Sequence, residues 1–80
     1  MSAITLYIKE IKTRKRLRRQ YALQNLREYM RSVKEEDIAK EIMRMTDIND
    51  IKILWEAGLT QILQKAASTR IEELIKRRSE

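Results

Sequence analysis

The sequence predicts an all-α protein: a long basic N-terminal helix followed by two or three shorter helices, packed as a helical bundle. The 80-residue chain contains no proline and one glycine, so little in it interrupts a helix. Apolar residues recur at helical spacing through most of its length. Charged residues make up 38% of the chain, which is typical of ion-paired helices joined by short loops and of thermophile proteins.

The segment over residues 3–9 allows two interpretations. Ile4, Leu6 and Ile8 alternate with more polar neighbours, as in a β-strand. Ile4, Ile8 and Ile11 also share one face of a helix. We favour the helix, because no turn residue separates this segment from the basic residues that follow. The strand would suit a ribbon-helix-helix fold, but the loop and the glycine-containing link of that fold are missing.

A long helix is predicted over about residues 12–31, with Leu26 and Met30 on its apolar side. The segment from Ser32 to Glu35 then matches a capping box, in which each of these two side chains bonds to the other's backbone N–H. One helix is therefore expected to end near residue 31 and another to start near residue 33.

The second helix should run to about residue 45, and a third should follow over residues 48–57 after an N-cap at Thr46 or Asp47. Gly58 is expected to end the third helix in a positive-φ conformation.

Thr60 should cap the last helix, which is predicted to end near residue 78. Its apolar side and those of the preceding helices supply the expected core or dimer contacts, with Trp55 as the largest core side chain. The full set is Leu26, Met30, Val33, Ile42, Leu54, Trp55, Leu63, Ile71 and Leu74.

The distribution of charge is the most informative feature for function. The chain has a net charge of +6, and the segment over residues 9–19 alone contains seven basic residues and one acid. The remaining 69 residues carry equal numbers of acidic and basic groups. Such a concentrated basic segment favours phosphate binding. On one helix it would place Lys9, Lys12, Arg16 and Arg19 on a common face. We name the segment over residues 9–19 the basic run. Its candidate nucleic-acid contacts are Lys9, Lys12, Arg14, Lys15, Arg16, Arg18 and Arg19.

An enzyme is not expected. The chain has no histidine and no cysteine, so the usual zinc ligands and the Cys or His catalytic groups are absent, and no glycine-rich phosphate loop occurs. The adjacent acids Glu35, Glu36 and Asp37 are typical of a helix N-terminus. We expect no metal, no cofactor and no small-molecule substrate.

No run of 18 apolar residues occurs, and the first residues lack the pattern of a signal peptide. The expected location is therefore the cytoplasm. Without disulfides, so short a chain has a modest core, and a homodimer would add to its buried surface.

A basic segment followed by an amphipathic helix resembles the basic leucine-zipper plan, and the chain is similar in size and layout to the small basic DNA-binding proteins of archaeal plasmids and viruses. The resemblance implies site-specific binding of duplex DNA, association with a nucleoid or plasmid, and control of transcription or copy number, with the basic run as the contact. The zipper-like spacing lasts only two heptads, because Leu23 and Met30 are followed by Asp37. We therefore expect a single domain in which residues 1–33 contact DNA and residues 34–80 form the helical bundle and the dimer contact.

Other functions stay open. The apolar stripes around Trp55 could serve a protein–protein adaptor, Tyr7, Tyr21 and Tyr29 could stack on RNA bases, and Ile4, Ile8 and Ile11 could insert beside anionic lipid. Packing inside the protein is the simpler role for Tyr21 and Tyr29.

Overall fold

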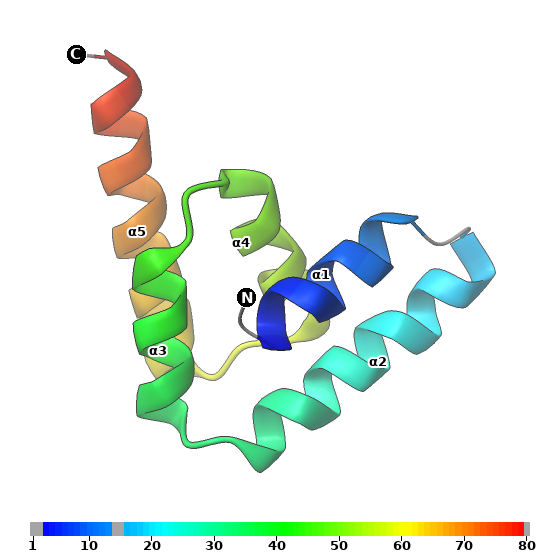
Figure 1. The fold of residues 1–80 in the computed structure, drawn as a ribbon. Helices are drawn as coiled ribbons and strands as arrows, with labels where there is room; N and C mark the ends of the chain where they lie inside the picture. The colour runs from blue at the N-terminus through cyan, green and yellow to red at the C-terminus, as the bar shows by residue number, and fades with distance from the viewer. Residues whose placement is uncertain (1–2, 14–15, 80) are drawn as a thin grey trace.

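The structure, a computed structural model, describes residues 3–13 and 16–79, and of residues 16, 17 and 79 the backbone alone. Every secondary-structure element in these ranges is a helix, which confirms the predicted all-α class (Figure 1). The helices are α1 Ala3–Thr13, α2 Arg16–Ser32, α3 Glu35–Arg44, α4 Ile48–Ala57 and α5 Gln61–Ser79.

Residues 3–9 are helical, so the helix interpretation is confirmed and the strand of a ribbon-helix-helix fold is wrong. Ile4, Ile8 and Ile11 form the buried side of α1. Their spacings of four and three residues place all three on one side of a helix, whereas a strand would alternate its side chains between two faces.

The expected long basic helix is wrong, because the basic run is divided between two helices. α1 ends at Thr13, whose hydroxyl donates to the Glu10 carbonyl, and α2 begins at Arg16. The two helices pack against each other as an antiparallel hairpin (Figure 1). On one straight helix, Ile8 and Leu26 would lie about 27 Å apart. The hairpin brings both into one core, so burial of apolar surface favours the fold-back.

Three predicted helix boundaries are confirmed. The Asp47 side chain accepts from the Asn49 backbone N–H at 2.8 Å and caps α4. Gly58 ends α4 with a φ of 116°, and its N–H donates to the Leu54 and Trp55 carbonyls. Thr60 precedes α5, and its hydroxyl accepts from the Leu63 N–H at 3.4 Å. Each boundary depends on residues close in the sequence.

The capping box at Ser32 is wrong. The Ser32 hydroxyl donates to the Tyr29 carbonyl at 2.8 Å, within the last turn of α2. α3 starts two residues later than expected, after Lys34, whose side chain makes no capping bond. Glu35 accepts a 2.5 Å hydrogen bond from the Thr60 hydroxyl instead of reaching back to Ser32. A tertiary contact thus replaces the local one.

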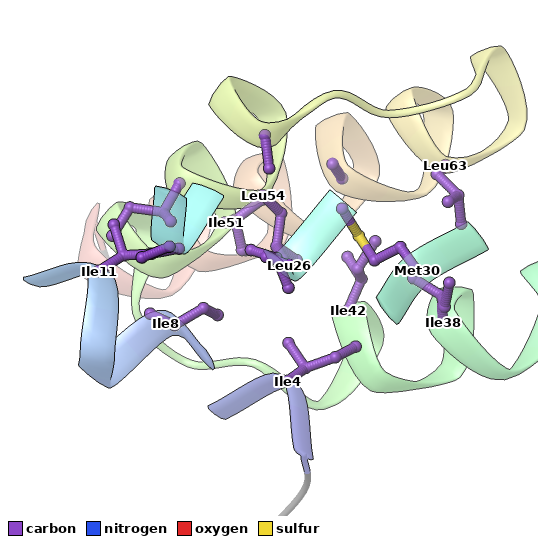
Figure 2. Close-up of a cluster of buried hydrophobic side chains, with 14 of the residues drawn as sticks. Ile4, Ile8, Ile11, Leu26, Met30, Ile38, Ile42, Ile51, Leu54 and Leu63 are labelled. Carbon is purple, nitrogen blue, oxygen red and sulfur yellow. The ribbon is translucent and has the colours of Figure 1, made fainter. Parts of the chain in front are cut away.

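The core lies where α1, α2 and α4 meet and continues toward α3 and α5 (Figure 2). In one part, Leu26 lies among the isoleucines of α1 and the buried Ile51 and Leu54 of α4. In the other, Met30 lies near Ile38, Ile42 and Leu63. Residues of α2 belong to both parts of the core, so α2 connects the packing around α1 and α4 with the packing around α3 and α5.

α3 and α5 lie side by side, and α5 extends beyond the end of α3 (Figure 1). α5, with 19 residues, is longer than α2, with 17, so the expectation of only shorter helices after the basic one is wrong. The radius of gyration is 12.4 Å, close to the value of about 12 Å typical of a folded chain of this length.

Candidate nucleic-acid interface

The described residues of the basic run lie at one end of the α1–α2 hairpin. Lys9 and Lys12 belong to the last part of α1, and Arg16, Arg18 and Arg19 to the first part of α2. Because the helices are antiparallel, these two parts lie at the same end (Figure 1). Arg14 and Lys15 lie outside the described residues, as does the side chain of Arg16. The described members of the run are therefore gathered at one end of the hairpin rather than spread along one helix face.

Lys12 is exposed, but its ammonium is paired with carboxylates at the start of α4. Its ammonium forms ion pairs with Asp50 and, at 3.7 Å, with Asp47. The hydrogen bond to Asp50 raises the pKa of Lys12 above its ordinary value of 10.5; partial burial opposes this, and the charges of both carboxylates add to it. Lys12 is thus partly neutralised within the protein.

Arg19 makes a second link to α4. Its Nη2 lies 2.8 Å from Oε2 of Glu56, and both side chains are partly exposed. The expected common face of Lys9, Lys12, Arg16 and Arg19 is therefore not available as a set, because two of its members are bound to carboxylates of α4. The acidity of residues 47–58 was the signal for these contacts in the sequence.

Lys9 and Arg18 are the members of the basic run that the structure leaves exposed and outside any ion pair among the described residues. Lys9 comes from α1 and Arg18 from α2. They are the described cations of the run best placed to meet an external anion.

The residues expected in the core divide into three groups. Trp55 is 39% exposed, so its expected role as the largest core side chain is wrong; Leu54, its neighbour, is fully buried. Successive residues of a helix point about 100° apart, so only one of the two can face the core squarely. Val33 and Ile71 are partly buried, and the buried members are Leu26, Met30, Ile42, Leu54, Leu63 and Leu74.

The tyrosines also differ from one another. Tyr29 packs against the core and against Tyr7, with ring centroids 5.1 Å apart and an interplanar angle of 34°. Tyr21 is 73% exposed, so the expected packing role of this ring is wrong. It lies on α2 two residues after Arg19, near the basic run in the sequence.

Arg70 is a structural residue that the sequence analysis missed. It is buried, donates from Nε to the Met45 carbonyl at 2.8 Å, and pairs through Nη1 with Glu73 at 3.0 Å. The bond to Met45, 25 residues away, attaches α5 to the end of α3, and no local sequence pattern indicates it.

Within the described ranges, no group of three acidic, histidine or cysteine side chains is arranged to hold a metal ion. None of the helices described has the length and apolar character needed to cross a membrane. Comparisons of the chain with family models, with curated proteins and with solved structures gave no match.

Proposed function

We propose that the protein is a non-enzymatic nucleic-acid-binding module that grips duplex DNA with the basic end of the α1–α2 hairpin. The observation that supports this proposal best is the location of the charge. The whole excess of +6 arises within residues 9–19, and the described residues of this segment meet at one end of a helical hairpin. A polyanion would relieve the repulsion among these cations and release its own counterions on binding.

The start of α2 adds to the suitability of this end for phosphates. α2 begins inside the basic run, and its first turn contains no acidic residue. The free N–H groups of a first helical turn attract anions, and the exposed Arg18 belongs to this turn. One helix with its side chains is about 10–12 Å wide, which matches the major groove, whereas a two-helix hairpin is too wide. The proposed arrangement places the start of α2 at the groove and Lys9 at a flanking phosphate.

Regulation of transcription or copy number, as a homodimer, is the proposed role of this binding. A basic end that binds phosphates supplies affinity for DNA, and contacts from Arg18 to base edges would supply sequence preference. Two copies in a dimer would present two such ends to two half-sites.

The experiment that tests this function is a titration of fluorescent duplex DNA, followed by anisotropy over a series of salt concentrations. The test variant combines Lys9→Ala with Arg18→Ala. The control combines Lys40→Ala with Lys65→Ala, which removes the same charge from exposed positions on α3 and α5. If both test residues contact phosphates, the slope of log affinity against log salt should flatten by about two.

An equal loss of affinity in the control would contradict the proposed interface, because it would show that only net charge matters. Duplex RNA and single-stranded DNA of the same length distinguish the nucleic acids. Tighter binding of either would replace duplex DNA as the proposed ligand.

The partial exposure of Trp55 favours a second candidate function, a protein–protein adaptor. Tryptophan is enriched at the centres of interfaces, and this side chain, 39% exposed, is available for such contact. A partner that binds wild-type protein and Lys9→Ala/Arg18→Ala equally, but not Trp55→Ala, would support the adaptor.

A further inference from the structure

A pocket of about 590 Å³ lies where the end of α2, the start of α3 and the α4–α5 turn meet. Its apolar side includes the buried Met30, Ile38 and Leu63, which lie close together in Figure 2. These three side chains are only 7%, 1% and 4% exposed, so a ligand would mainly meet the partly buried Val33 and Leu59, which line the same side. The pocket thus offers an aliphatic surface without an aromatic ring, at a volume typical of small-molecule sites.

Two arginines stand beside this aliphatic surface. Arg27 and Arg31 are four residues apart on α2, so they lie on the same side of the helix, and both line the pocket. Neither forms an ion pair with another described residue. The acid in the lining, Glu35, accepts a hydrogen bond from Thr60 at 2.5 Å. Two cations and one acid leave the lining with a net positive charge.

Arg27 is held in place by the α4–α5 turn. Its Nε donates to the Ala57 carbonyl, and a Cβ on Gly58 would lie 3.4 Å from that Nε. An arginine has five N–H donors, so this bond leaves four at the terminal nitrogens. A guanidinium fixed by its backbone partner loses less freedom when it binds an anion.

We propose that this pocket binds a medium-chain aliphatic carboxylate. The carboxylate lies between Arg27 and Arg31, because a planar guanidinium presents paired donors that match the two oxygens of a carboxylate. The aliphatic chain lies against Val33 and Leu59, above the buried Met30, Ile38 and Leu63. The site is separate from the basic run, because 13 residues of helix, about 20 Å, separate Arg31 from Arg18.

The test is a titration of ¹⁵N-labelled full-length protein with octanoate, in which the amide shifts of Gly58, Leu59 and Leu63 are followed. For a ligand with about ten heavy atoms, we expect saturation in the millimolar range. Acetate, which lacks the chain, and octylammonium, which carries the opposite charge, are the matched ligands. Arg31→Gln removes an exposed pocket cation, and Arg44→Gln removes an exposed arginine outside the pocket lining.

Saturable shifts with octanoate, about tenfold weaker binding by Arg31→Gln and unchanged binding by Arg44→Gln would support the site. Equal binding of octylammonium or acetate would overturn it, as would equal binding by Arg31→Gln or the absence of saturable shifts in the wild-type protein. Circular dichroism checks that both variants keep the helical content of the wild type.

Discussion

The ammonium of Lys12, near the end of α1, is paired with the carboxylate of Asp50 in the first turn of α4. Asp47, the N-cap of α4, lies 3.7 Å from the same ammonium. The contact joins the basic run to the acidic side of α4, so internal carboxylates and an external polyanion would compete for one cation. It also attaches the α1–α2 hairpin to the rest of the bundle.

Removal of these carboxylates should strengthen DNA binding. In Asp47→Asn/Asp50→Asn, Lys12 loses its internal partners and becomes available to phosphate, and asparagine still caps α4. We expect affinity for duplex DNA to rise about three- to tenfold at low salt, with a smaller gain at high salt. Anisotropy measures both.

The control for this variant is Glu28→Gln/Glu36→Gln, which neutralises two exposed acids on α2 and α3. It changes the net charge by the same amount without freeing Lys12. A gain in affinity as large as that of the aspartate variant would show that net charge, rather than competition for Lys12, governs binding.

The raised pKa of Lys12 predicts a stability difference that depends on pH. Because the folded-state pKa lies above the unfolded value of 10.5, the ion pairs contribute fully below that pH. Their contribution disappears as pH rises through the folded-state pKa. Lys12→Gln should therefore be about 0.5 kcal/mol less stable than the wild type at neutral pH, and the difference should shrink at alkaline pH.

Urea unfolding at neutral pH and above pH 10.5 measures this difference. Lys52→Gln is the control, since Lys52 is exposed and forms no ion pair with the residues described. A Lys12→Gln deficit that stays constant across the alkaline range would refute the assignment.

Substitution of Gly58 should destabilise the fold. Its φ of 116° is strained for any residue with a Cβ, and the added atom would also lie 3.4 Å from Arg27 Nε. We expect Gly58→Ala to lower the free energy of unfolding by about 1–3 kcal/mol. Chemical denaturation tests this, with Ser68→Ala on the exposed side of α5 as the control. A loss in Gly58→Ala no larger than in the control would be inconsistent with the strained turn.

The same substitution, isoleucine to valine, should cost more stability at a buried position than at an exposed one. Ile42 is fully buried and Ile62 is 64% exposed. Ile42→Val should therefore cost about 0.5–1.5 kcal/mol of unfolding free energy, while Ile62→Val should cost less than about 0.5 kcal/mol. Thermal and urea unfolding of the two variants give the comparison, and equal losses would contradict the described packing of α3 and α5.

Local chemistry made several features predictable. Asp47, Gly58 and Thr60 mark helix ends because a short polar side chain or a positive φ acts within a few residues. Ser32 shows the limit of this reasoning. Its hydroxyl can donate backward to Tyr29 as well as accept from a following N–H, and the path of the chain around Glu35 and Thr60 decides between them.

The role of an apolar side chain at the edge of a stripe was less predictable. Trp55 follows Leu54 directly, and periodicity alone places either residue on the inner side of α4. The packing of α4 against α2 and α5 selects Leu54, so the wider Trp55 remains partly exposed. Periodicity shows which side of a helix faces the core. Whether a residue at the edge of that side is buried depends on how the neighbouring helices pack.

By itself, the sequence determined the helical class, the ends of α4 and the concentration of positive charge in residues 9–19, because all three depend on local composition and spacing. Only the tertiary structure decided how that charge is presented. It divided the basic run between α1 and α2 and paired Arg19 with Glu56, 37 residues away. Such pairing depends on which helices pack together, and burial of the isoleucines of α1 against α2 and α4 is the physical reason for that packing.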